Sequence, residues 1–223
     1  YEVGMSHLGM KILYHAINAR EDALCERVFS PWVDMAALMR AENMPLFTLE
    51  SRTPVREFDL LGITLQYEMS FSNILEALDL AGIPLRRAER ASGPFVICGG
   101  PCAFNPEPLA PFVDLFVLGD GEVSTHQTIE VYKQWKALGL PREEYLRMAS
   151  RIPGVYVPSF YDVSYHADGT IAAIEPKEGT GAPKVVYKAL VNDLTHAEYP
   201  EKLIVPYGEI VHDRIMLEIF RGC

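Results

Sequence analysis

Phe95-Val96-Ile97-Cys98-Gly99-Gly100-Pro101 is a short apolar run that ends in two glycines and a proline. It has the length and composition of a strand that is buried on both faces of a parallel sheet. Two further runs, Leu60–Leu65 and Val113–Leu118, have the same apolar character. Helical patterns separate these runs along the chain. The sequence therefore predicts an α/β fold with a Rossmann-like, doubly wound parallel sheet and helices on both faces.

Other segments show the spacing of helices or of short strands. Apolar residues recur at helical spacing in the predicted helices, at 7–19, 33–41, 73–81, 107–112, from 119–122 to about Leu138, and after Pro141. Gly82 closes the third of these helices as a C-terminal cap. Short strands are expected at 25–29 and 45–51. Because Tyr1–Gly4 leads directly into a helical pattern, we expect the first strand of the sheet to precede Tyr1.

The pattern changes from Val155 onward. Residues 156–165 and 171–174 read as strands on either side of Asp168-Gly169, a strong hairpin signal, and 185–190 reads as a third strand. A linker rich in proline follows from Tyr199 to Pro206, and a final strand is expected from about Val211. The sequence therefore predicts three parts: an α/β domain at 1–152, a small antiparallel β insert at 153–198, and a linker with the start of another domain at 199–223.

Composition narrows the class of protein. The chain has 223 residues, 49% of them apolar, and a formal net charge of −10. This charge argues against a mainly electrostatic binder of nucleic acid or membrane. There is no apolar stretch of 18 residues and no charged-then-apolar leader. Four cysteines in a chain of this length do not indicate a disulfide scaffold, so we expect a cytoplasmic protein.

A ligand site is expected at one edge of the predicted sheet. In doubly wound sheets, ligands bind beyond the carboxyl ends of the strands, and glycines there let the backbone approach the ligand. The alternative is that these glycines only turn the chain. The candidate residues at this edge are Ser6, His7, Gly9, Thr64, Gln66, Tyr67, Gly99, Gly100, Pro101, Gly119, Asp120, Gly121 and Glu122.

Two nucleotide motifs are absent: no G-x-G-x-x-G follows a strand, and there is no G-x4-G-K-[ST]. Cys98 and Cys102 lack a third cysteine at cluster spacing, so a structural role is favoured for both, and Cys25 is expected to pack in the core. At the other end of the chain, the apolar run Arg214–Phe220 reads as a strand that ends in Arg221-Gly222-Cys223. Thiolates are soft ligands that suit iron, which makes Cys223 a candidate metal ligand, although most lone cysteines are buried small residues.

Three stretches, Tyr1–Gly9, Gly99–Pro108 and His212–Cys223, resemble a family of uncharacterised bacterial radical S-adenosylmethionine (SAM) proteins with an N-terminal cobalamin-binding-like domain. The resemblance implies that Cys223 is the first ligand of a 4Fe-4S cluster, with two more in a C-x3-C-x2-C pattern, and that SAM binds the open iron. It also implies that 199–223 carries the first strand of a radical SAM barrel. His7-Leu8-Gly9 does not fit the cobalt-ligating motif D-x-H-x-x-G, so a histidine ligand to cobalt is not expected. Members of the cobalamin-dependent radical class often bind cobalamin without such a histidine, and cobalamin therefore remains an open expectation.

Two functions remain at this stage. The first is the N-terminal part of a radical SAM enzyme of unknown substrate, in which reductive cleavage of SAM yields a 5′-deoxyadenosyl radical and the protein orients the cofactor. The second is a non-catalytic α/β module that docks on protein or RNA, with Cys223 incidental. The presence of a C-x3-C-x2-C triad starting at Cys223 would separate them.

Overall fold

A four-stranded sheet with the order β1-β2-β3-β4 lies at the centre of the molecule in the computed structural model, which describes residues 1–221. β1 (Leu60–Thr64), β2 (Phe95–Gly99) and β3 (Leu115–Val117) are parallel neighbours, as the sequence predicts. β4 (Val155–Tyr156) pairs with β3 in the antiparallel direction. It therefore belongs to the central sheet, and the expectation that the whole segment from Val155 belongs to the insert is wrong on this point.

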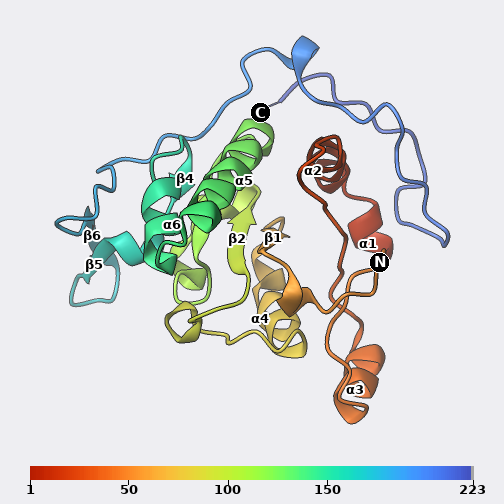
Figure 1. The fold of residues 1–223 in the computed structure, drawn as a ribbon, viewed down its shortest axis with the longest axis horizontal. Helices are drawn as coiled ribbons and strands as arrows, with labels where there is room; N and C mark the ends of the chain where they lie inside the picture. Colours follow the sequence, from red (N-terminus) through yellow and green to blue (C-terminus); the bar gives the residue numbers. More distant parts are fainter. Residues whose placement is uncertain (222–223) are drawn as a thin grey trace.

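Helices cover both faces of this sheet (Figure 1). The α-helices are α1 (Glu2–Met5), α2 (Leu8–Asn18), α3 (Val33–Ala41), α4 (Phe71–Leu80), α5 (Gly121–Leu138) and α6 (Arg142–Ala149). Short 3-10 turns connect the elements, at Val55–Glu57, Glu68–Ser70, Arg87–Glu89, Pro101–Phe104, Glu107–Leu109, Pro158–Phe160 and Leu194–His196. The helix expected at 107–112 is thus a single 3-10 turn. None of the helices within residues 1–221 is long and apolar enough to cross a membrane.

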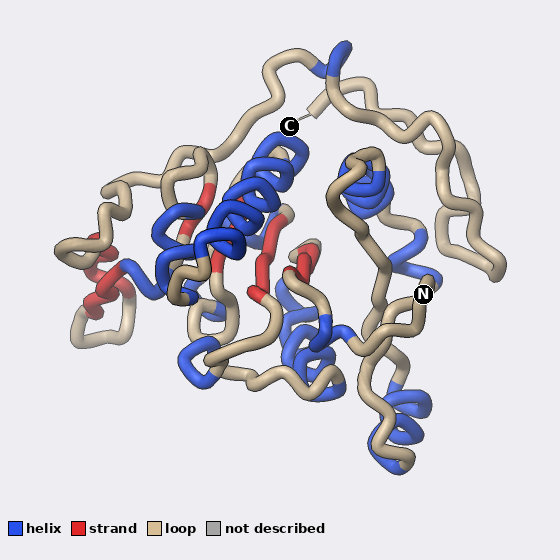
Figure 2. Tube along the Cα trace, in the orientation of Figure 1, coloured by secondary structure: helices blue, strands red, loops and turns tan. Residues whose placement is uncertain are grey.

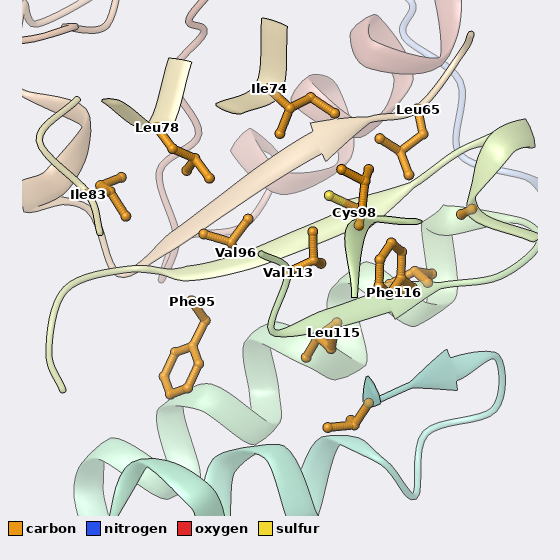
Figure 3. Close-up of a cluster of buried hydrophobic side chains, with 14 of the residues drawn as sticks. Leu65, Ile74, Leu78, Ile83, Phe95, Val96, Cys98, Val113, Leu115 and Phe116 are labelled. Carbon is orange, nitrogen blue, oxygen red and sulfur yellow. The ribbon is translucent and has the colours of Figure 1, made fainter. Parts of the chain in front are cut away.

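The hydrophobic core fills the space between the sheet and its helices. Figure 3 shows Ile74 and Leu78 of α4 on one side of the sheet and Phe95 of β2 on the other. Phe95, Phe116 and Tyr145 are each at most 1% exposed, and the rings of Phe95 and Tyr145 lie 4.1 Å apart. Burying such side chains supplies most of the free energy of folding, at roughly 25 cal/mol per Å² of apolar surface.

A small hairpin forms a second sheet. β5 (Tyr161–Tyr165) and β6 (Ile171–Pro176) are antiparallel, and the backbone N–H of His166 donates to the carbonyl oxygen of Thr170 to close the turn. Gly169 has φ +85°, the left-handed conformation that the Asp-Gly pair favours. The expectation of a hairpin around Asp168-Gly169 is confirmed.

Four strands expected from apolar patterns are not present in the described part of the chain: 25–29, 45–51, 185–190 and 214–220. Residues 25–29 lack a strand neighbour, and the Asn18 side chain takes over the hydrogen bonds of the Cys25 backbone at 2.9 and 3.0 Å. The second and third segments contribute only single bridges, Phe47 with Pro54 and Gly119 with Ala189. In the fourth, Ile215, Leu217 and Ile219 are all at least 75% exposed. An apolar pattern forms a strand only where another strand offers hydrogen bonds.

Residues 190–221, here called the C-terminal segment, run mostly as loop around the outside of the domain (Figures 1 and 2). The segment passes α5, where Glu198 bonds His126 at 3.0 Å. It then reaches the N-terminal residues, where the His212 N–H donates to the Ser6 hydroxyl at 3.0 Å. It returns to the start of α5 through Arg221.

Candidate functional site

His7 stands at the start of α2. Its Nδ1 accepts a hydrogen bond from the Met10 backbone N–H at 3.0 Å, which caps the helix. Close to the ring, the Gln66 amide nitrogen donates to the Thr64 hydroxyl at 2.7 Å. Burial lowers the pKa of His7, and the Gln66 side chain opposes this shift in part. Burial thus favours the neutral ring, and His7, Gln66 and Thr64 form a link between α2 and the end of β1.

Gly100 lies beside this link and packs against backbone. Its φ of +105° is a conformation that residues with a side chain rarely adopt. A Cβ there would lie 2.9 Å from the carbonyl oxygen of Leu65, and that oxygen also accepts a hydrogen bond from the Cys102 N–H at 3.0 Å. Gly99 ends β2, and Pro101 begins the next 3-10 turn. The two glycines thus let the loop fold back onto β1.

The Gly119–Glu122 loop is covered by the C-terminal part of the chain. Gly119 has φ +96° and forms a bridge with Ala189, so close that an added Cβ would overlap with the Ala189 carbonyl. Asp120 accepts a hydrogen bond from the Val191 N–H at 2.7 Å. On the helix side, a Cβ at Gly121 would lie 3.4 Å from Leu13 of α2. Both glycines thus permit close approach of other parts of the same chain, Ala189 at Gly119 and Leu13 at Gly121.

Arg221 completes this arrangement. Its guanidinium forms an ion pair with Glu122 and lies 3.4 Å from an Asp120 oxygen and 2.8 Å from a Glu218 oxygen. Glu122 is 7% exposed, so the pair is shielded from water. Hydrogen bonds to Glu218 and Glu122 raise the pKa of Arg221. The Gly119–Glu122 loop, which was predicted as part of a ligand site, therefore holds Arg221, two positions before Cys223.

The predicted site residues thus fall into two groups. The structure brings His7, Thr64, Gln66 and Gly100 together around the end of β1, and it brings Gly119–Glu122 together with the C-terminal segment. Ser6 is buried, and its hydroxyl donates to the Glu2 carbonyl oxygen at 2.8 Å. Gly9 lies within α2 beside the His7 ring.

Tyr67 and its neighbours form the exposed part of this edge. Tyr67, Met69 and Phe104 are 61%, 75% and 57% exposed, and they follow the ends of β1 and β2. The Cys102 thiol and the Glu68 carboxylate come from these two loops, and both burial and Glu68 raise the pKa of Cys102. Met69 and Phe104 were not among the residues predicted from the sequence. Their position in the loops that follow β1 and β2 was the signal that could have pointed to them.

The cysteines within residues 1–221 do not suit an iron–sulfur cluster, because clusters bind thiolates. Burial raises the pKa of Cys25 to about 11 and raises the pKa of Cys98 further. In the same part of the chain no three His, Cys, Asp or Glu side chains group in a way that could hold a metal ion. Cys223, the metal ligand expected from the sequence, lies outside the described residues.

Comparisons with known proteins agree with this outline. A family model described as radical SAM proteins, N-terminal, matches residues 9–158. The chain is also similar to the uncharacterized protein MJ0966 of Methanocaldococcus jannaschii, with 36% identity over 84 residues. That match covers 37% of this chain and 17% of the archaeal protein, so the chain spans only a small part of its relative. No solved structure matches the chain.

Proposed function

This chain belongs to the radical SAM proteins through their N-terminal region, and we propose that it is the N-terminal part of a radical SAM iron–sulfur enzyme whose substrate is unknown. In such proteins a 4Fe-4S cluster and SAM supply the radical chemistry. We propose Cys223 as the first cluster ligand. The observation that carries this proposal is the family match over residues 9–158.

In this proposal, contacts at the start of α5 hold the end of the C-terminal segment in place. Arg221 is tied to Asp120 and Glu122 at the start of α5, and Ala189 and Val191 are hydrogen-bonded to the same loop. These contacts hold the approach to Cys223 against the carboxyl edge of the sheet. We propose that residues 1–152 together with β4 act as a support for a radical SAM barrel that begins within 199–223, and that the rest of 153–198 is a peripheral insert.

Cobalamin is a further proposal for the same edge. The Nδ1 of His7 accepts from the Met10 N–H as a helix cap, so this nitrogen is not available to ligate cobalt. Backbone fills the space beside Gly100 and Gly119, so these two glycines do not fit a cradle for a flat ligand. The exposed side chains of Tyr67, Met69 and Phe104 would be the surface that holds a flat corrin ligand.

The test of the proposed enzyme is made in the complete protein. Cys223→Ala should abolish the visible charge-transfer absorbance and lower the iron and sulfide content, because a cluster loses one of three thiolates. Cys102→Ala is the matched control and should retain the cluster, since burial and Glu68 raise the pKa of Cys102 and disfavour the thiolate that a cluster binds. A Cys223→Ala protein with full iron and sulfide would exclude this role and leave the non-catalytic docking module.

Cobalamin is tested separately by titrating the complete protein with hydroxocobalamin. Gly100 is unsuitable for a blocking variant, because its positive φ and its contact with Leu65 make any side chain disruptive. Tyr67→Ala changes an exposed side chain and should leave the fold intact. Saturable spectral changes that weaken in Tyr67→Ala would support a corrin surface, and no change at high ligand concentration would exclude it.

A further inference from the structure

β1 has a hydrogen-bonded neighbour on one side only. In the part of the chain that the structure describes, it pairs with β2 and with no other strand. The Leu65 N–H, just after β1, donates to the Gly99 carbonyl oxygen at 2.6 Å. Because successive residues of a strand direct their backbone groups to opposite sides, Leu60, Gly62 and Thr64 direct theirs away from β2. No hydrogen bond within residues 1–221 involves these outward backbone groups.

The side chains of β1 are also less buried than its apolar sequence predicts. Leu60, Leu61 and Ile63 are only half-buried, Gly62 and Thr64 are exposed, and a Cβ at Gly62 would meet open space. In β2, by contrast, three of the five residues are buried. Strands of parallel sheets are normally covered on both faces and paired on both sides. The composition of β1 therefore fits an inner strand better than a strand at the edge of the sheet.

The segment between α2 and α3 has a second row of unpaired backbone groups. Cys25 bonds the side chain of the last α2 residue at 2.9 and 3.0 Å, and the Arg27 carbonyl oxygen accepts from the Leu49 N–H at 2.9 Å. Within residues 1–221 no hydrogen bond involves the backbone of Glu26 or Val28. This alternation is typical of an extended strand with one side paired. In Figure 1 the segment lies beyond β1, on the side away from β2.

We propose that a strand from the part of the complete protein that precedes Tyr1 lies between β1 and residues 25–29 and is parallel to β1. Its backbone bonds the outward groups of β1 on one side and those of Glu26 and Val28 on the other. A single strand thus provides partners for both rows, and a row of unpaired groups is a ready template for such pairing. The proposal depends on neither the cluster nor SAM.

The position of α1 and α2 identifies this occupant and its direction. His7 lies at the carboxyl end of β1, close to Gln66. A strand that leads into Tyr1 and is parallel to β1 ends at the same edge, where α1 and α2 begin. α2 then packs on α5, since a Cβ at Gly121 would lie 3.4 Å from Leu13, and the chain continues into the segment before α3. A helix between two strands is the usual connection in a parallel sheet.

Amide hydrogen exchange at single residues tests the proposal, measured by mass spectrometry on the complete protein and on the 223-residue chain. The Gly62 and Thr64 amides should exchange at least about 100-fold more slowly in the complete protein, because they become hydrogen-bonded there. Leu61 and Ile63 are matched controls in the same strand. Their N–H groups face β2, so they should exchange slowly in both proteins.

A version of the complete protein that begins at Tyr1 identifies the source of the strand. It should lose the protection of Gly62 and Thr64. If this protection persists, another segment covers the edge and the proposal is overturned. Slow exchange already in the 223-residue chain, together with a dimer in size-exclusion chromatography, would assign the edge to a second copy. Equally fast exchange in the 223-residue chain and the complete protein would mean that no strand pairs with this edge. Either result overturns the proposal.

A substitution in the complete protein tests the same pairing without truncation. Gly62→Pro removes an N–H that faces away from β2, so it should speed exchange at Thr64 while Ile63 remains slow. Gly62→Ala keeps that N–H and is the control, in which Thr64 should stay protected. The same slow exchange at Thr64 in both variants would contradict a strand at this edge.

Discussion

Arg221 forms an ion pair with Glu122, a residue 99 positions earlier in the chain. Glu122 lies in the first turn of α5, where a negative charge is favourable because the helix dipole is positive at that end. The carboxylate thus stabilises the start of α5 and binds the end of the C-terminal segment. One residue links the carboxyl edge of the sheet to the approach to Cys223.

The first prediction concerns this pair. Glu122→Gln should lower the free energy of unfolding by on the order of 1–2 kcal/mol, more than an exposed pair, because the Glu122 side chain is only 8% exposed. A double-mutant cycle with Arg221→Gln, followed by urea unfolding, isolates the coupling between the two side chains. Exposed Glu175→Gln serves as control. Strictly additive effects of Glu122→Gln and Arg221→Gln would show that the pair carries no coupling energy.

The second prediction concerns Asp114, at the opposite edge of the sheet. Its carboxylate accepts from the Val96 N–H at 2.8 Å and lies 3.4 Å from Arg90 and 3.3 Å from Arg142. The Arg90 side chain is fully buried, so Asp114→Asn leaves a charge without its counterion. We expect a loss of about 3–5 kcal/mol in the free energy of unfolding, measured in urea.

Asp162→Asn is the matched control for Asp114→Asn. Asp162 pairs with Lys177 at 3.6 Å, but its side chain is 78% exposed, so its removal should cost less than about 1 kcal/mol. Adding Arg90→Met to Asp114→Asn should recover part of the loss, because the unpaired charge is gone. Similar losses in Asp114→Asn and Asp162→Asn would refute the role given to burial.

The sequence predicts the central strands because their apolar runs are continuous and each run ends at a polar or glycine-rich loop. Leu60–Thr64, Phe95–Gly99 and Leu115–Val117 all lie where the pattern places them. The same kind of pattern fails at 25–29 and 214–220, because a strand requires a hydrogen-bonded neighbour and composition does not show where that neighbour is. For residues 25–29, the Asn18 side chain replaces the neighbour.

The candidate site shows the same division. Position after a strand brings Thr64, Gln66 and Gly100 to one edge, and this follows from the sequence. The contacts of the site residues do not follow from the sequence. Only the folded chain shows that Gly119 contacts Ala189 and that Glu122 contacts Arg221. From the sequence alone, a glycine that is needed for close contact within the chain cannot be distinguished from one that is needed for contact with a ligand.

The third prediction is a pH dependence that comes from His7. Burial holds the pKa of His7 below its unfolded value of about 6.5. The unfolded chain therefore binds a proton first as the pH falls, and the folded state loses stability from about pH 6.5 downward, by at most ~1.4 kcal/mol per pH unit. Above that pH both states are neutral and the group has no effect.

His7→Asn tests this prediction, because asparagine also caps helices but does not titrate. The free energy of unfolding should fall less on acidification from pH 7.5 to 5 in His7→Asn than in the wild type, as measured by urea unfolding at each pH. The other five histidines are present in both proteins, so the comparison isolates His7. Parallel pH profiles would mean that the His7 pKa does not differ between the folded and unfolded states.

The last prediction compares two glycines with positive φ at the two ends of α5. Gly119 precedes the helix with φ +96°, and Gly139 follows it with φ +62°. A Cβ at Gly139 meets open space, so Gly139→Ala adds only the strain of a left-handed residue, about 1–2 kcal/mol. A Cβ at Gly119 also overlaps with the Ala189 backbone. Gly119→Ala should therefore reduce the Tm further and speed proteolysis within 185–200. Equal Tm values and equal cleavage in the two variants would show that Gly119 is required for its backbone conformation alone.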